Sequence, residues 1–141
     1  MQEDKKNLLI VDDEPSVRTS LELILSRFYD VHTAENAEEA LGYIHTSGEN
    51  FPDLIILDVM MPGIGGLALL EKLNEDFPKL PIIMLTASNS IQAAVKAMKI
   101  GAVDYLSKPY DVDELLSLIE EALREGAQGR TSASQILTAQ H

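Results

Sequence analysis

Five polar residues of the sequence have the right types to carry out phosphoryl transfer. Each of them stands one or two residues after the end of a predicted strand: Asp12, Asp13, Asp58, Thr86 and Lys108. A carboxylate can attack phosphorus and form an acyl phosphate. The remaining demand on the protein is to place cations and donors around the phosphoryl oxygens. We therefore interpret Asp58 as a candidate nucleophile and Lys108 as a cation that faces the transferred group.

The three aspartates also have the composition of a metal site. Two carboxylates about 4 Å apart repel by about 4 kcal/mol at an effective dielectric constant near 20, and a divalent cation removes that cost. Mg²⁺ prefers oxygen ligands, and Mn²⁺ is the natural substitute. We expect Asp13 and Asp58 to bind the metal directly and Asp12 to hold a metal-bound water or a second ligand position. The backbone carbonyl of Met60 would be the last of the metal ligands that the protein supplies.

Hydrogen-bond donors would stabilise the charge on the transferred group. We expect these donors to be the Thr86 hydroxyl and backbone N–H groups near Val59, Met60 and Ala87. Taken singly, an Asp at a strand end is usually a helix cap or turn residue, and Lys108 would be an ordinary surface residue. The combination of acids, hydroxyl and cation at successive strand ends favours the functional interpretation.

The pattern of the whole chain explains how these residues can meet. Five apolar runs alternate with segments of helical periodicity: residues 8–11, 31–34, 54–57, 81–85 and 103–106. Continuous apolar runs are typical of strands buried on both faces of a parallel sheet. The alternation predicts a doubly wound α/β fold, in which ligands bind beyond the carboxyl ends of the strands.

Local signals place the helices between these strands. Pro15 suits a first helical turn, Asn36 with Glu39 resembles a capping box, Gly101 is a C-cap, and Asp111 caps the last helix. Apolar residues at helical spacing predict the buried faces. For the first helix these are Val17, Leu21, Ile24, Leu25 and Phe28. For the fourth they are Ile91, Ala94, Val95 and Met98, which we favour as core.

Composition excludes several classes of function. The net charge of −12 argues against nucleic-acid and anionic membrane binding. There is no cysteine, so thiol chemistry and disulfides are excluded. No apolar run approaches the roughly 20 residues of a membrane span, and the charged N-terminus does not resemble a signal peptide, so we expect a cytoplasmic protein. Residues 1–125 are predicted to form one domain and residues 126–141 a flexible tail or linker.

Four motifs carry a resemblance to a known family. Residues 9–14 (LIVDDE), 58–63 (DVMMPG), 84–87 (MLTA) and 101–109 (GAVDYLSKP) resemble those of response-regulator receiver domains of bacterial two-component systems. The match covers roughly residues 7–125. Residues 94–106 are further similar to receivers of nitrogen-regulator-type transcriptional activators, which usually carry an ATPase domain and a DNA-binding domain that this chain does not contain.

The resemblance implies a flavodoxin-like sheet of strand order 2-1-3-4-5 with five helices. It implies a sensor histidine kinase as phosphoryl donor, Asp58 as acceptor, magnesium on Asp12 and Asp13, and a cis peptide bond between Lys108 and Pro109. Thr86 and Tyr105 would form a switch pair. Phosphorylation would change the face built from the fourth helix, fifth strand and fifth helix, and the output would be a change in self-association or in partner docking.

The resemblance leaves the setting of the domain open. The chain would be a switch that catalyses only its own phosphorylation and dephosphorylation, not an enzyme acting on an external substrate. It would regulate transcription as part of a longer regulator or act as a single-domain receiver.

Three other interpretations are less well supported. A haloacid-dehalogenase-like phosphatase needs a second Asp two residues after its nucleophile, where this chain has Met60. A flavodoxin-like cofactor binder needs a phosphate-cradling loop after the first strand, where this chain has three acids. A degenerate receiver would have lost a pocket residue, and none is lost.

Overall fold

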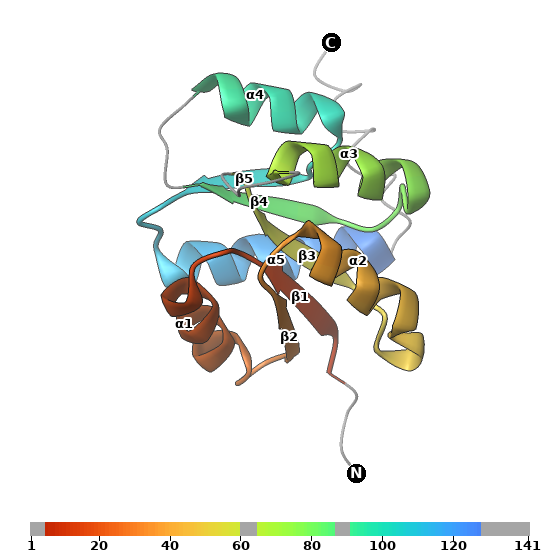
Figure 1. Ribbon diagram of the computed structural model, residues 1–141. Helices are drawn as coiled ribbons and strands as arrows, with labels where there is room; N and C mark the ends of the chain where they lie inside the picture. The colour runs from red at the N-terminus through yellow and green to blue at the C-terminus, as the bar shows by residue number, and fades with distance from the viewer. Residues whose placement is uncertain (1–4, 60–64, 87–90, 128–141) are drawn as a thin grey trace.

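The computed structural model contains one parallel sheet with helices on both faces, as the sequence predicts. It describes residues 5–59, 65–86 and 91–127. The strands lie in the order β2-β1-β3-β4-β5 and all neighbours are parallel (Figure 1). The elements are β1 (Asn7–Val11), α1 (Pro15–Leu25), β2 (Asp30–Ala34), α2 (Ala37–Thr46), the 3₁₀ turn η1 (Gly48–Asn50), β3 (Leu54–Asp58), α3 (Gly66–Asp76), β4 (Ile82–Thr86), α4 (Ile91–Ile100), β5 (Asp104–Ser107) and α5 (Val112–Ala127).

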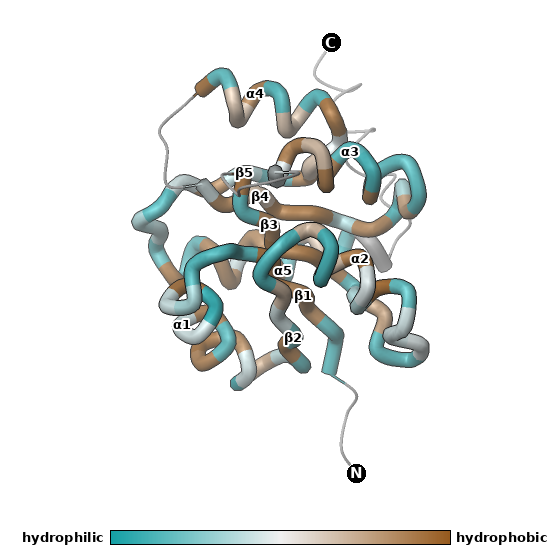
Figure 2. Tube along the Cα trace, in the orientation of Figure 1, coloured by the Kyte–Doolittle hydropathy of each residue, from teal (hydrophilic) through white to brown (hydrophobic). Residues whose placement is uncertain are grey.

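The sheet separates two hydrophobic cores. Successive strand residues point to opposite faces, so Leu8 and Ile10 of β1 pack on the side of α1 and α5, while Leu9 and Val11 pack on the side of α2, α3 and α4. Figure 2 shows the central strands β3 and β4 as apolar along their length. Burial on both faces explains why these strands read as continuous apolar runs rather than alternating ones.

Most of the predicted helix signals have the expected geometry. Pro15 is the first residue of α1, and Asn36 Oδ1 accepts a hydrogen bond from Glu39 N at 2.8 Å. The return bond of the capping box is displaced by one residue, because Glu39 Oε1 accepts from Glu35 N. Gly101 follows α4 with a φ of 143°, a value that favours glycine.

Two predicted apolar faces are wrong in part. Phe28 lies beyond the end of α1 and is exposed, because that helix ends at Leu25. On α4, Ile91 is 77% exposed and Val95 and Met98 are about half exposed. Ala97 is the residue of α4 that is buried. A helical apolar stripe indicates one face but does not say whether that face is covered.

The last helix reaches beyond the predicted limit of the domain. Helix α5 extends to Ala127, two residues past the boundary expected at residue 125, so the start of the predicted tail is helical. The rest of that tail, residues 128–141, lies outside the described residues. None of the described helices combines the length and apolarity that a membrane crossing needs.

Candidate functional site

The predicted site residues meet at the carboxyl edge of the sheet. Asp58 and Thr86 are the last residues of β3 and β4, so they lie inside the strands rather than just after them. Asp12 follows β1 and Lys108 follows β5 directly. The strands extend this far because the ladder continues: Asp58 pairs with Leu85. The backbone fixes the position of each of these residues, which a loop would not do.

Three carboxylates form an acidic cluster at this edge, made of Asp12, Asp13 and Asp58. Each offers an oxygen within 4.8 Å of the others. Asp12 is 2% and Asp58 4% exposed, and Asp13 is the most open of the three. Carboxylate oxygens are the ligands that a hard divalent cation prefers, so the cluster fits Mg²⁺ or Mn²⁺. The Met60 carbonyl, predicted as a further ligand, lies outside the described residues.

Lys108 partly neutralises this acidic cluster. Its Nζ lies 3.0 Å from Asp12 Oδ2, 3.7 Å from Asp58 Oδ2 and 3.8 Å from Glu14 Oε1. Burial by itself lowers the pKa of Lys108, but its hydrogen bond to Asp12 and the charges of Asp58, Asp12 and Glu14 outweigh that effect, so the pKa is raised. The ammonium group therefore stays charged beside the candidate nucleophile.

The backbone of Lys108 is held as firmly as its side chain. Its N–H donates to the Thr86 carbonyl oxygen at 2.6 Å, which ties the end of β5 to the end of β4. The Lys108–Pro109 peptide bond is cis, as the family resemblance implied. The contacts of Nζ with Asp12 and Asp58 place the lysine side chain over the carboxyl edge of the sheet.

Thr86 and Tyr105 lie on neighbouring strands. Thr86 is fully buried, and it pairs with Ser107 of β5. Tyr105 is two residues before Ser107, so its side chain points to the same face of the sheet as Thr86. Tyr105 is partly buried and packs against the core on the α2, α3 and α4 side. The two predicted switch residues are therefore neighbours on one face.

Sequence reasoning missed two residues that hold Asp12. Arg18 Nη1 donates to the Asp12 carbonyl oxygen at 2.6 Å, and Glu14 N donates to Asp12 Oδ1 at 2.9 Å. Arg18 lies on α1 four residues after Glu14, a spacing that places both on one side of the helix start. That spacing, together with a cation next to an acidic run, was the available signal.

One expected phosphate donor is engaged elsewhere. The Val59 N–H donates to the Leu85 carbonyl oxygen at 3.0 Å, because the β3–β4 ladder continues past Asp58. It is therefore not directed at the acidic cluster. The other expected donors, at Met60 and Ala87, lie outside the described residues.

Comparisons with known proteins agree with this geometry. The family model described as "Response regulator receiver domain" matches residues 8–120. A "DNA-binding transcriptional regulator NtrC" from Proteus hauseri is 41% identical over 120 residues, which are 84% of this chain and 25% of that protein. A CheY-like receiver domain from Methanospirillum hungatei JF-1 superposes with a TM-score of 0.82 at 33% identity, over 89% of this chain and 99% of that one.

A second solved structure links the chain to nitrogen-regulator receivers. The receiver domain of NtrX from Brucella abortus has a TM-score of 0.77 at 36% identity and covers 83% of this chain and 98% of that one. The chain spans about a quarter of the length of the NtrC relatives that it matches. The similarity to these regulators is therefore a similarity to their receiver domains.

Proposed function

The chain belongs to the response regulator receiver domain family, and from this premise we propose that Asp58 accepts a phosphoryl group from a sensor histidine kinase. The observation that carries the proposal is a buried Asp58 with two further acids within 4.8 Å and Lys108 Nζ at 3.7 Å. A carboxylate placed solely for stability would gain little from two like-charged neighbours. The same placement suits a nucleophile that needs cations around it.

The transfer exchanges one bond to phosphorus for another. An Asp58 carboxylate oxygen forms the new bond while the bond from phosphorus to the donor's histidine nitrogen breaks and its electron pair returns to that nitrogen. Asp58 then carries a doubly charged phosphoryl group instead of one carboxylate charge. A small movement brings the Lys108 ammonium group to the phosphoryl oxygens, where it is one hydrogen-bond donor. The Thr86 hydroxyl is the second donor on this side.

Asp12, Asp13 and Asp58 would hold Mg²⁺, with Mn²⁺ as a substitute and the Met60 carbonyl as a further ligand. When bound, the cation neutralises the acidic cluster and the charge that develops on the phosphoryl oxygens. Arg18 and Glu14 keep the Asp12 backbone and carboxylate in place. The protein's own contribution is thus a fixed set of oxygens and one ammonium group.

The response passes from Thr86 to Tyr105. A Thr86 hydroxyl drawn towards the phosphoryl group leaves space that the Tyr105 ring enters, and the face formed by α4, β5 and α5 changes. The exposed Ile91, Val95 and Met98 on α4 support this face as a docking surface, with a second copy of the chain as the partner. The chain would be a switch that catalyses only its own phosphorylation and dephosphorylation.

The wider role follows from the relatives. We assign residues 1–125 to the receiver and residues 126–141 to a tail or linker, of which residues 126 and 127 continue helix α5. The chain regulates transcription as the receiver of a longer regulator, or it acts as a single-domain receiver. With a net charge of −12, it makes no direct contact with nucleic acid, and its place is in the cytoplasm beside the kinase.

The test is an intact-mass measurement after incubation with acetyl phosphate and Mg²⁺. We expect a single phosphoryl adduct that disappears in Asp58→Asn and when Mg²⁺ is omitted. Asp53→Asn, on an acid at the opposite end of β3, is the matched control and should keep the adduct. Because some receivers accept only from their kinase, a negative result is followed by beryllofluoride binding, and failure of both would contradict the proposal.

A further inference from the structure

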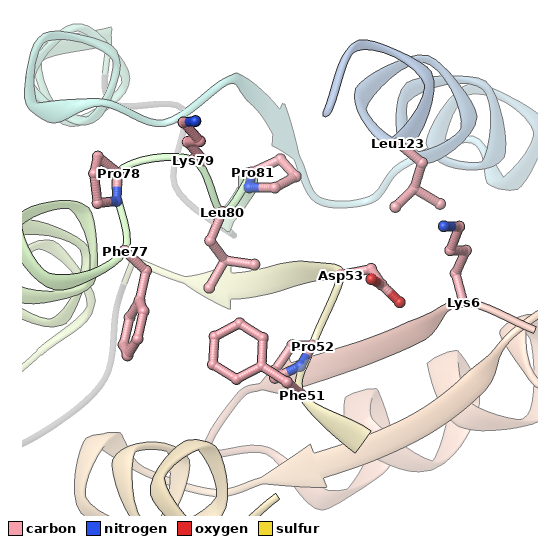
Figure 3. A pocket seen from close by; sticks show the side chains of 10 residues that line it. All are labelled: Lys6, Phe51, Pro52, Asp53, Phe77, Pro78, Lys79, Leu80, Pro81 and Leu123. Carbon is pink, nitrogen blue, oxygen red and sulfur yellow. The ribbon is translucent and has the colours of Figure 1, made fainter. Parts of the chain in front are cut away.

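A second hollow lies at the opposite edge of the sheet from the acidic cluster. It has a volume of about 500 Å³ and lies at the amino ends of β1, β3 and β4. Figure 3 shows the side chains that line it: Phe51, Phe77 and Leu80 come from one side, and Leu123 of α5 faces them across the opening. Its volume is in the range of known ligand pockets. We call it the amino-edge pocket.

The walls of the amino-edge pocket suit an apolar occupant. Two aromatic rings form part of its wall, with the Phe51 and Phe77 centroids 5.3 Å apart in an edge-on arrangement. Phe51 is partly exposed, although aromatic rings normally gain from burial. The charged lining residues are of mixed sign, with Lys6 and Lys79 against Asp53. They therefore favour neither an anion nor a cation.

The chain itself carries a suitable occupant. Beyond Leu123 the sequence is polar or small for twelve residues, and the next large apolar side chains are Ile136 and Leu137. The segment 128–141 contains no acidic residue, and its one charged residue besides His141 is Arg130. All 23 acids lie in the preceding part, so the negative charge of that part does not repel this segment.

The segment starts beside the pocket and is long enough to return to it. Leu123 lines the amino-edge pocket, and α5 ends one turn later at Ala127. Ile136 is the ninth residue after Ala127, and nine residue steps can span about 30 Å when extended. A tether of this length gives an effective concentration in the millimolar range. An apolar contact whose dissociation constant lies below this range is then mostly occupied.

We propose that Ile136 and Leu137 dock into the amino-edge pocket, against Phe51, Phe77, Leu80 and Leu123. This docking directs the chain after α5 back along the edge of the sheet opposite to Asp58. It covers the apolar walls of the amino-edge pocket, and it fixes the direction in which the chain continues after α5. It does not depend on the phosphorylation of Asp58.

The test uses a nitroxide label on a single introduced cysteine, Ala139→Cys, in the full chain. The chain contains no cysteine of its own, so the label has one site of attachment. We expect the amide signals of Phe51, Leu80 and Leu123 to lose intensity, while those of Asp12 and Lys108 at the far edge keep theirs. The same label on the Ile136→Ser/Leu137→Ser variant is the matched control and should restore the signals.

Three outcomes would overturn the proposal. The first is no loss of intensity at the amino-edge pocket, and the second is an equal loss in the control variant. The third is a loss of intensity in a mixture of nitroxide-labelled chains without ¹⁵N and ¹⁵N chains without the nitroxide. The occupant of the pocket would then be the tail of a second copy. The amide signals of Leu9 and Ile10, one from each hydrophobic core, report whether every sample keeps the fold.

Discussion

At the scale of single residues, the acidic cluster brings three carboxylates together at one edge of the sheet. Asp12 and Asp58 are almost fully buried, and Lys108 is the cation recorded within 4.0 Å of both. One ammonium group leaves a negative surplus when Asp13 is included. A buried charge without a full counter-charge costs stability, so the unfilled site should be less stable than the cation-bound one.

Mg²⁺ should therefore stabilise the fold measurably. At a concentration about 100 times its Kd, the cation should add about 2.7 kcal/mol to the free energy of unfolding, which corresponds to a rise in Tm of about 5–10 °C. Thermal unfolding monitored by circular dichroism, with EDTA and with Mg²⁺, measures this. Asp13→Asn should lose most of the increase, whereas Glu75→Gln, on an exposed acid of α3, should keep it. Equal shifts in the two variants would mean that the cation binds elsewhere.

Thr86 provides the second prediction at this scale. Its hydroxyl is buried, and a hydrogen bond to a charged group contributes about 1.5–3 kcal/mol. Thr86→Ala should thus shift the balance between the two forms of the phosphorylated domain by about 10- to 100-fold. The phosphoryl adduct itself should still form.

Two measurements test this prediction for Thr86. Intact mass shows whether the phosphoryl adduct forms, and the NMR resonances of Tyr105 show whether the domain responds to beryllofluoride. In the parent chain and in Thr86→Ser, which keeps the hydroxyl, the Tyr105 signals should move on treatment. In Thr86→Ala they should stay close to their untreated positions. If Thr86→Ala responds like the parent chain, the coupling does not run through this hydroxyl.

At the scale of elements, the start of α3 is pressed against the end of β3. A Cβ atom on Gly66 would meet the Asp58 carbonyl oxygen and lie 2.7 Å from Val59 Cα. The Gly66 N–H donates to the Val59 carbonyl oxygen at 3.2 Å. Helix α3 therefore needs a glycine here to approach the backbone of the candidate nucleophile.

Gly66→Ala should destabilise the fold and disturb Asp58. Overpacking against backbone costs about 1–3 kcal/mol, and urea unfolding measures the loss. Gly42→Ala is the matched control, because nothing lies within 4 Å of its Cβ position on α2. That control should be stabilised by about 0.5–1 kcal/mol. If Gly66→Ala is as stable as the parent chain, α3 can move away from β3 at little cost.

The strand ends could be predicted from the sequence, whereas the surroundings of the helices could not. The strand ends that carry Asp12, Asp58 and Lys108 were predictable, because burial on both faces leaves a continuous apolar signal and the parallel fold brings the carboxyl ends together. The exposure of Ile91 could not be predicted, because helical periodicity indicates an apolar face but does not show whether another element covers it. The spacing from Glu14 could indicate that Arg18 lies near the acidic run, but not that it binds the Asp12 carbonyl, since a long side chain reaches several backbone groups.

At the scale of the whole molecule, the net charge and the exposed apolar side chains have opposite effects on the association of two copies. The net charge of −12 disfavours the association of two copies. The face of α4 nevertheless exposes Ile91, Val95 and Met98, and a shallow groove beside it contains Val95, Met98 and the partly buried Tyr105. Exposed apolar side chains clustered on one helix are typical of an interaction surface.

Beryllofluoride treatment should therefore promote dimerisation through α4, β5 and α5, most strongly when salt screens the net charge. The Debye length falls from about 10 Å at 0.1 M to about 3 Å at 1 M ionic strength, so the dimer fraction seen by sedimentation velocity should rise over this range. Val95→Glu places a further negative charge in the contact and should abolish the dimer. Leu23→Glu adds the same charge on an exposed leucine of α1 and should leave it intact. Because both variants have the same net charge, a loss of association in both would show that total charge, and not the α4 face, controls assembly.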